Sequence, residues 1–428
     1  MAPEPVQSTR RVRVIGAGMA GLAAATLLAE GGHRVILYEA GKFGGGRCRS
    51  YQDSELGCRI DNGNHLLMSG NQAVTRYLTR IGAIDTLTGP TRPVFPFIDL
   101  ISGKSWTIRL NAGRIPWWVL VKSWRVPGTS ASQYLALRRL EKACNADLVA
   151  ALMQDVHPLY EHLIEPLAVA VLNTKPAVAS AAPLGAVLQE TIGRGGVAAM
   201  PRFPRQGLSE SFIDPALRYL SANRAEIRFG ARVAALGIED GRVAGLSGPN
   251  LDERIEPTEG VILAVPPWVA TELLPGLVAP NQFEAILNVH FRARIPEGEA
   301  GFYGLLGGTA EWVFQKGEAV SVTVSAANDR INVDAGQLAQ KIWTDLHRAF
   351  RIESSMPAFR VVKEKRATFA ATPEQLLRRP QTRTHLTNLF LAGDYTATNL
   401  PATIEGAIRS GESAAALCTD WSNQHLAS

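Results

Sequence analysis

The first forty residues combine two short apolar runs with one longer stretch rich in Ala and Leu. The apolar runs lie at 12–15 (VRVI) and 35–38 (VILY), and the Ala/Leu-rich stretch lies between them at 19–31. Short apolar runs of this kind predict strands, and the longer stretch predicts a helix. The chain is therefore expected to begin with a strand–helix–strand unit.

From about residue 76 to residue 170 the pattern changes. Apolar residues recur at spacings of three and four, most clearly in QYLALRRLEKACNADLVAALMQ at 133–154. This spacing is typical of amphipathic helices. We therefore expect an inserted helical lobe in this part of the chain.

Strand signals return after this lobe. The stretch AEIRFGARVAALGIEDGRVAGL predicts a hairpin that turns at Glu239-Asp240-Gly241, and GVILAVPP predicts a buried strand ended by two prolines. Alternating stretches between 285 and 325 and an amphipathic helix at 335–350 indicate a second lobe with its own sheet. The end of the chain predicts a strand (LFLAGD), a loop and a helix from about 402 to 418.

Length and composition narrow the class of protein. A chain of 428 residues is too long for one simple core and indicates about two domains. The formal charge of +5 is mildly basic, but no dense Lys/Arg run and no zinc or RNA-binding motif is present, which excludes nucleic acid as a partner. A basic face over an anionic bilayer remains open.

The cysteines and the apolar segments bear on the compartment. The four cysteines have no C-x-x-C spacing and form no cluster with histidine, so we expect a reduced, cytoplasmic setting and no metal. The opening residues MAPEPVQSTRR lack an apolar segment, and no run of about 18 apolar residues follows, which predicts neither a signal peptide nor a membrane span. Any membrane contact would be peripheral.

A glycine motif lies between the first strand and its helix. Gly16, Gly18 and Gly21 have the G-x-G-x-x-G spacing, which lets backbone N–H groups at a helix N-terminus approach a pyrophosphate. The motif is weak alone, but the second strand ends in Glu39, close to the spacing at which an acid binds ribose hydroxyls. Together they predict a dinucleotide site, against the alternative of a merely structural turn.

Two further segments favour FAD over NAD. EAGKFGGGRCRS supplies a second glycine cluster with Gly45 and Gly46, followed by Arg47, which is suited to a charge-assisted hydrogen bond to phosphate. In LFLAGDYTATNLPATIEG, a strand, Gly393-Asp394 and a turn precede a helix whose free N–H groups could face a flavin carbonyl. Read alone, this last segment is equally an ordinary strand–loop–helix.

These elements resemble the FAD-dependent amine oxidase and phytoene desaturase superfamily. Beyond them, GGRCRS, IDNGNHLLMSGN, RIPWW, LYEHLIEPLAVAVLNTKP, NVHFR, SVTVSAAN, VVKEKRATFAATPEQ and AGDYTATNLPATIEGAIRSG resemble the squalene-associated FAD-dependent desaturases, or hydroxysqualene dehydroxylases. The residues expected to bind FAD are Gly16, Gly18, Gly21, Glu39, Gly45, Gly46, Arg47, Val233, Gly393, Asp394, Thr403 and Ile404.

The resemblance implies an α/β fold with a discontinuous Rossmann-like FAD-binding domain and an α+β substrate domain that contains the helical insertion. The FAD-binding domain is expected over 9–75, 205–265 and 385–421, the substrate domain over 76–204 and 266–384, and flexible termini at 1–8 and 422–428. Two positions depart from the family pattern: Tyr395, where Trp is common, and Asn399, where Gly is common. Both lie in the turn on the flavin side, and Asn tolerates positive φ better than most residues.

The resemblance also implies a reaction. Reduced FAD would deliver a hydride to hydroxysqualene, with loss of water, to give squalene for bacterial hopanoid synthesis. No second G-x-G-x-x-G follows a strand, so the reductant is expected to be an external electron donor. An oxidative polyprene desaturase and an amine oxidase remain alternatives, and so does a flavin-binding carrier without chemistry.

The polar cluster DNGNH at 61–65 supplies the candidate catalytic residues. In related flavoproteins this segment runs past the flavin, which nominates Asp61, Asn64 and His65. His65 is the preferred proton donor, as an imidazolium, because the unperturbed pKa of histidine lies near neutrality. Asp61 is expected either to orient His65 or to hold the backbone. Alternatively, Asp61 and Asn62 cap a turn and His65 is a core histidine with its hydrogen bonds satisfied. His290 and Glu405 are weaker candidates.

Residues 114–124 (RIPWWVLVKSW) interleave Trp117, Trp118 and Trp124 with basic side chains. Such amphipathic aromatic segments suit a membrane interface, from which a C30 lipid substrate would enter. A peripheral contact with the inner face of the cell membrane is one reading, and a helix packed on the core is the other.

Overall fold

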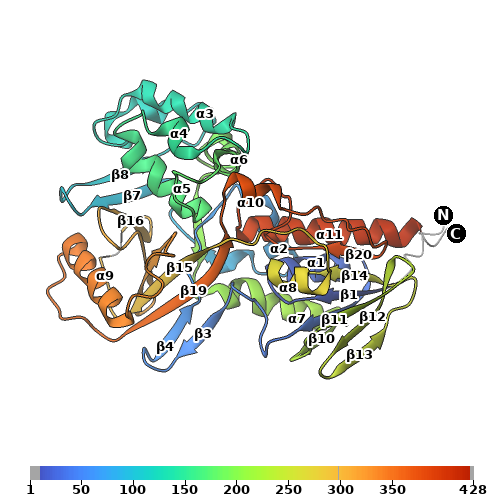
Figure 1. Cartoon of the computed structure of the whole chain (residues 1–428). Coiled ribbons are helices and arrows are strands. Elements are labelled where there is room, and N and C mark those ends of the chain that lie inside the picture. The colour runs from blue at the N-terminus through green and yellow to red at the C-terminus, as the bar shows by residue number, and fades with distance from the viewer. Residues whose placement is uncertain (1–9, 297, 425–428) are drawn as a thin grey trace, which may run out of the picture.

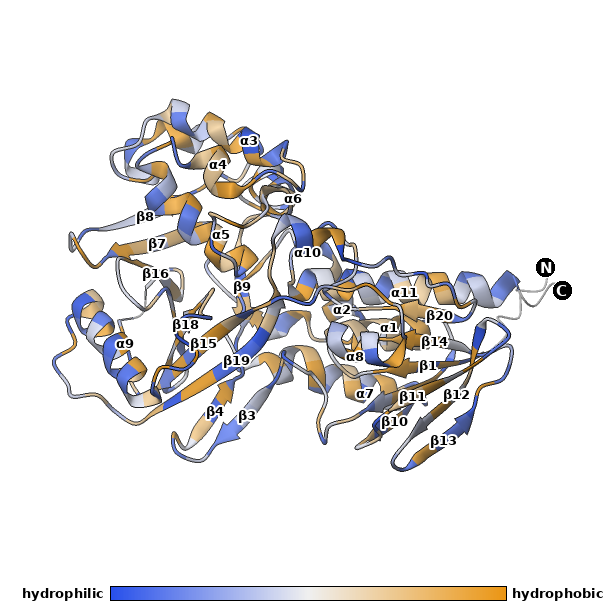
Figure 2. Ribbon diagram, viewed as in Figure 1, coloured by the Kyte–Doolittle hydropathy of each residue, from blue (hydrophilic) through white to orange (hydrophobic). Residues whose placement is uncertain are grey.

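The computed structural model describes residues 10–296 and 298–424. A five-stranded parallel sheet forms the centre of the first lobe (Figure 1). The strand order is β10-β2-β1-β14-β20, and the neighbouring strands all run parallel. Figure 2 shows these central strands as predominantly hydrophobic, as expected for a sheet covered on both faces. The strands are β1 (Arg11–Ile15), β2 (Arg34–Glu39), β10 (Glu226–Phe229), β14 (Gly260–Leu263) and β20 (Leu389–Leu391).

Helices cover one face of this sheet, and a small antiparallel sheet covers the other. The apolar core beneath the helices contains Leu22, Leu28, Phe212 and Ile408, all fully buried. The helices are α1 (Met19–Glu30), α2 (Gln72–Arg80), α7 (Asp214–Ala222) and α11 (Ile404–Gln424). The other face is covered by β11 (Ala235–Glu239), β12 (Arg242–Gly248), β13 (Leu251–Arg254) and α8 (Pro267–Leu273).

The predictions for these elements are mostly confirmed. The opening strand–helix–strand unit is present, and the hairpin turns at Asp240 and Gly241, which have φ of 49° and 70°. The five strands come from the chain segments expected to form the FAD-binding domain, although the domain boundaries themselves stay predictions. The termini at 1–8 and 425–428 lie outside the described residues, whereas 422–424 continue α11 and are helical.

A seven-stranded mixed sheet forms the second lobe, in the order β19-β15-β18-β17-β16-β7-β8. Its strands alternate: Leu287 and Val289 of β15 face the apolar core under α9, whereas Asn288 and His290 face the opposite side. The strands are β7 (Val94–Asp99), β8 (Ser105–Arg109), β15 (Phe283–Phe291), β16 (Phe302–Leu306), β17 (Trp312–Lys316), β18 (Ala319–Val324) and β19 (Phe359–Phe369), and α9 spans Ala335–Phe350.

The expectation of helices from 76 to 170 is wrong in part. Strands β7 and β8 interrupt it and join the edge of the second sheet, because β7 pairs in parallel with β16, far away in the sequence. The predicted helix at 133–154 is broken at 142–148. The lobe contains the 3₁₀ turns η2 (Trp117–Leu120), η3 (Lys122–Trp124) and η4 (Ala131–Ala136), and the helices α3 (Leu137–Glu141), α4 (Val149–Met153), α5 (Glu165–Leu172) and α6 (Ala181–Glu190).

Short strands connect the lobes. The hairpin of β3 (Ser50–Asp53) and β4 (Cys58–Asp61) leads into the segment 61–65, and β9 (Pro201–Pro204) pairs with β5 (Leu67–Met68) and β6 (Leu87–Thr88). Helix α10 (Pro373–Leu377) lies between β19 and β20 in the chain. None of the helices in the described part of the chain is long and apolar enough to cross a bilayer.

Candidate active site

The turn between β1 and α1 is built from three glycines. Gly16 has φ of 106°, and a Cβ there would lie 2.4 Å from the carbonyl oxygen of Ala264. A Cβ at Gly21 would lie 1.8 Å from the carbonyl oxygen of Gly16, whereas a Cβ at Gly18 would meet no heavy atom of the described residues within 4 Å. Packing therefore requires the first and third glycines, and the second leaves an open face at the N-terminus of α1, which favours an anion.

Glu39 ends β2 beside this turn. Its Oε2 accepts a hydrogen bond from the backbone N of Ala17 at 2.9 Å, and its Oε1 accepts one from the N of Gly41 at 2.8 Å. The N of Ala231 donates to the backbone oxygen of Glu39 at 2.9 Å, which holds the segment of the buried Val233 nearby. The sheet thus brings Glu39 and this segment to the edge occupied by the glycine turn.

The second glycine loop lies against the first. The N of Gly45 donates to the backbone oxygen of Ala17 at 2.7 Å, and Gly45 and Gly46 both have positive φ. Arg47 follows, with Nη2 at 2.7 Å from Oδ2 of Asp394 and Nη1 at 2.5 Å from a backbone oxygen of β19. Burial alone would lower the pKa of Arg47, but the Asp394 carboxylate outweighs it and the pKa is raised.

The C-terminal loop reaches the same place from β20. The N of Gly393 donates to Oγ of Ser410 at 2.9 Å, and Oγ1 of Thr403 accepts from the N of Gly406 at 3.1 Å at the start of α11. Ile404, the first residue of α11, is 6% exposed. Asn399 has φ of 63°, so the residue that replaces the family's glycine does adopt the left-handed conformation.

Arg379, which could not be recognised from the sequence, holds this loop through hydrogen bonds from its guanidinium group. Its guanidinium donates to the backbone oxygens of Leu400 (2.8 Å), Asp394 (3.2 Å), Tyr395 (3.4 Å) and Thr396, and to Oγ1 of Thr398 (3.0 Å). Burial lowers the pKa of Arg379 to about 10, and the Asp394 carboxylate acts in the opposite direction. The segment LLRRP gives no sign of this role, because the contacts depend on a loop fifteen or more residues away.

Asp61 is almost fully buried and both of its carboxylate oxygens are bonded. Oδ1 accepts from Oγ of Ser50 at 2.5 Å and from the N of Leu208 at 2.9 Å, and Oδ2 lies 2.5 Å from Nζ of Lys316. Burial alone would raise the pKa of Asp61, but Lys316 and the hydrogen bonds outweigh it and the pKa is lowered. Asp61 is therefore a carboxylate that holds its surroundings in place, and no hydrogen bond joins it to His65 among the described residues.

Asn64 lies on the polar face of the second sheet. Its Nδ2 donates to Oγ of Ser321 at 2.8 Å and to Oγ1 of Thr323 at 3.0 Å, both on β18. Its Oδ1 is buried and has no hydrogen-bond partner among the described residues. Asn64 thus links the loop to the sheet and keeps one acceptor unused. Polar residues alternating with apolar ones in SVTV and NVHF were the signal for this face.

His65 is half-buried, and none of the described residues hydrogen-bonds to its ring. Burial, Lys316 and Arg47 together lower its pKa to about 4, and Asp61 opposes them only in part. The ordinary histidine pKa near neutrality therefore does not apply in this environment, which favours the neutral ring. The alternative of a core histidine with its hydrogen bonds satisfied does not describe it either.

The weaker candidates have structural contacts. His290 is 2% exposed, and its Nδ1 lies 2.9 Å from Oγ of Ser321. Glu405 accepts hydrogen bonds from the first N–H groups of α2, those of Ala73 at 3.1 Å and Val74 at 2.9 Å. Glu405 therefore caps α2 and joins it to α11.

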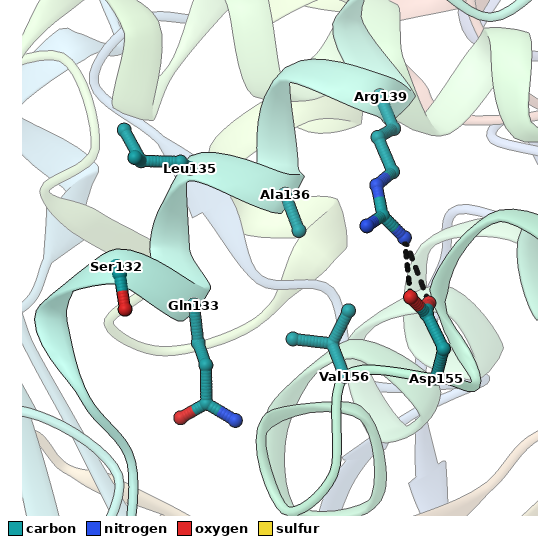
Figure 3. A pocket seen from close by; sticks show the side chains of 7 residues that line it. All are labelled: Ser132, Gln133, Leu135, Ala136, Arg139, Asp155 and Val156. Carbon is teal, nitrogen blue, oxygen red and sulfur yellow. Dashed lines mark hydrogen bonds and ion pairs between the residues drawn. The ribbon is translucent and has the colours of Figure 1, made fainter.

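A cavity of about 430 Å³ lies elsewhere, on the helical lobe (Figure 3). Its lining comes only from residues 132–156, and Nη1 of Arg139 bonds both carboxylate oxygens of Asp155 there, at 2.7 and 2.9 Å. The cavity shares no residue with the glycine turns or with segment 61–65. The candidate site is therefore the place where the two glycine turns, the loop of Asp394 and segment 61–65 meet.

Comparison with solved structures places the fold. An oxidoreductase from Methanosarcina mazei aligns with a TM-score of 0.73 at 16% identity, over 94% of this chain and 99% of that one. Cyclohexylamine oxidase from Brevibacterium oxydans aligns with a TM-score of 0.72 at 16% identity, over 96% and 98%. At this identity the likeness concerns the fold, which is the α/β fold expected from the sequence.

Sequence comparison is more specific. The family model of flavin containing amine oxidoreductases matches residues 19–294 and 309–419. The hydroxysqualene dehydroxylase of Zymomonas mobilis is 42% identical over 96% of this chain and 99% of its own length. That of Rhodopseudomonas palustris is 43% identical over 96% and 98%. The chain therefore belongs to the hydroxysqualene dehydroxylase family, within the flavin-containing amine oxidoreductases.

Proposed function

We propose that the protein replaces the hydroxyl group of hydroxysqualene by hydrogen, using a hydride from reduced FAD and a proton, and releases squalene and water. The observation that carries the proposal is the identity of 42% over nearly the full length of both this chain and a relative that bears the name of this activity. The squalene formed in this way would serve hopanoid synthesis in bacteria.

FAD fits the residues that are present. Gly18 opens toward the N-terminus of α1, where a pyrophosphate is favoured, and Glu39 lies at the end of β2, where the ribose of a dinucleotide is bound in this type of turn. Arg47 offers a cation beside both glycine loops. Bound and reduced, FAD supplies the hydride. The remaining contacts are expected from Gly16, Gly21, Gly45, Gly46, Val233, Gly393, Asp394, Thr403 and Ile404.

The chain's own task is to place the substrate and to provide a proton. We assign the proton to a ring nitrogen of His65, which lacks a hydrogen-bond partner among the described residues and lies within the influence of both Lys316 and Arg47. Burial and these two cations favour the neutral ring, so the donor is the minor imidazolium form, which is a stronger acid than an ordinary histidine and transfers its proton readily to the departing oxygen. Asp61 keeps Lys316 and segment 61–65 in place.

A membrane contact of the helical lobe would bring the lipid substrate to the protein. Ile115, Trp117, Leu120 and Leu135 are 78%, 47%, 72% and 62% exposed, on or beside the 3₁₀ turns η2 and η4. The ring of Trp118 is buried instead and packs on that of Tyr134, which joins these two turns. Residues 112–142 contain six basic residues and one acidic residue. Exposed apolar side chains in a basic segment suit the anionic inner face of the cell membrane.

The reaction can be tested by anaerobic mixing of the photoreduced protein with hydroxysqualene. The expected result is reoxidation of the flavin with one squalene formed per flavin, since the hydride has no other destination. Absence of reaction would contradict the proposal. If the oxidised, FAD-loaded protein instead oxidises an amine or phytoene, the protein is an amine oxidase or a desaturase.

The proton donor can be tested with His65→Ala. We expect single-turnover reoxidation to slow at least about tenfold while FAD stays bound, because general acid catalysis is worth about 10²- to 10⁴-fold. In the unmodified protein the rate should rise as the pH falls from 8 to 5, since a group with a pKa of about 4 is protonated progressively in this direction. The exposed His157→Ala serves as the control and should keep both the rate and its pH dependence. An unchanged rate in His65→Ala would discard the assignment.

The role of Arg379 can be tested with Arg379→Gln. Losing the bonds to the carbonyl groups of residues 394–400 should free this loop and weaken FAD binding about tenfold or more, at about 1 kcal/mol per hydrogen bond. Flavin fluorescence during dialysis measures the loss. The neighbouring Arg378, whose side chain bonds only the backbone oxygen of Ala279 among the described residues, provides the control, and Arg378→Gln should retain FAD. Equal retention by both variants would refute the assignment.

The membrane contact can be tested by flotation with vesicles that contain phosphatidylglycerol. The double variant Ile115→Ser, Leu120→Ser should bind at least about tenfold less, because burying each of these side chains is worth about 1.5–3 kcal/mol. Leu377→Ser is the matched control, since Leu377 is 80% exposed but lies on α10. Undiminished flotation of the double variant would count against the contact.

A further inference from the structure

The polar face of the second sheet carries a continuous chain of hydrogen bonds that starts at a backbone oxygen. Nδ2 of Asn288 donates to the backbone oxygen of Asn62 at 3.2 Å, and Oδ1 of Asn288 accepts from Oγ1 of Thr323 at 2.7 Å. A backbone oxygen can only accept, so the orientation of the Asn288 amide is fixed. The Thr323 hydroxyl donates its single hydrogen to Asn288, so its oxygen can only accept a hydrogen bond from Asn64.

This direction continues through Asn64. The group of Asn64 that faces Thr323 must be the NH₂, and its second hydrogen is donated to Oγ of Ser321. The hydroxyl hydrogen of Ser321 is then directed to Nδ1 of His290, at 2.9 Å, which leaves the ring hydrogen of His290 on Nε2. The backbone oxygen of Asn62 thereby fixes which group donates and which accepts in each of these hydrogen bonds. The orientation of the Asn64 amide follows from it.

The consequence is that Oδ1 of Asn64 remains unused. It is buried and has no partner among the described residues, and a buried acceptor left unpaired costs about 1–3 kcal/mol. The adjacent residue is His65, which has an imidazole ring also free of hydrogen bonds within the described part of the chain. An acceptor and a potential donor thus stand side by side in the sequence, at the end of segment 61–65.

We propose that Ser321, Thr323 and Asn288 are positioning residues that hold Oδ1 of Asn64 as the acceptor for the hydroxyl hydrogen of the substrate. The proposal rests on the proposed function, and it adds a site that distinguishes the alcohol from the hydrocarbon product. Accepting that hydrogen increases the electron density on the hydroxyl oxygen and leaves its lone pairs for the incoming proton. After the C–O bond breaks, the product lacks the group that Asn64 binds, which favours release.

The test compares two ligands on the oxidised, FAD-loaded protein. Dissociation constants of hydroxysqualene and squalene are measured from the flavin absorbance, so no turnover is needed. The unmodified protein should bind the alcohol about 5- to 10-fold more tightly than the hydrocarbon, the value of one hydrogen bond. Thr323→Val keeps the shape but lacks the hydroxyl, and should lose most of this preference while binding squalene unchanged. Thr323→Ser should restore it.

Controls separate this role from a general effect on the fold. Ser321→Ala removes the other acceptor of the Asn64 amide and should also reduce the preference for hydroxysqualene over squalene. It replaces Thr323→Val in the test if that variant is unstable. Thr344→Val, at an exposed position of α9, should leave the ratio unchanged. An equal ratio in all variants, or no preference in the unmodified protein, would overturn the inference. Failure of the reduced protein to convert hydroxysqualene would instead refute the proposed function, whatever the ratio.

Discussion

A buried ion pair holds segment 61–65 against the polar face of the seven-stranded sheet, and the candidate site depends on this contact. Asp61 ends β4 and Lys316 ends β17, and their side chains are 2% and 12% exposed. Removing one member of a buried ion pair typically costs about 3–5 kcal/mol, since the other charge is left without compensation. The pair therefore fixes the loop in one position, and Asn64 adds its bonds to β18 beside it.

The sheet can support this contact because its strands alternate. Val322 and Val324 pack under α9, while Ser321 and Thr323, which alternate with them, face the loop. One short strand thus supplies both a hydrophobic core and a polar floor. An apolar substrate needs few polar groups in its site, and these must be placed without exposing the core. Arg379 positions the loop on the cofactor side in a similar way, because its guanidinium donates hydrogen bonds to several backbone oxygens of the loop that begins at Asp394.

Local patterns account for what could be predicted. The strand–helix–strand unit, the glycine turn, the hairpin at Asp240 and helix α9 depend on residues close together in the sequence, and their periodicity or turn chemistry is sufficient. Strand β7 was missed because its partner β16 lies two hundred residues away and its sequence contains a proline. Lys316 and Arg379 could not be identified as site residues, since their roles depend on tertiary contacts. The pKa of His65 was misjudged because two of its determinants, burial and Lys316, are visible only in the fold.

The fold itself does not decide the direction of electron flow, since it is shared with a cyclohexylamine oxidase. A reductive reaction differs from an elimination or an oxidation in the hydrogen that the product gains. The most direct measurement is therefore the isotope content of squalene formed by the reduced protein in D₂O, where the transferable hydrogen of reduced flavin exchanges with solvent. A single deuterium on the carbon that carried the hydroxyl is the predicted result. Product without deuterium at that carbon would contradict reductive dehydroxylation.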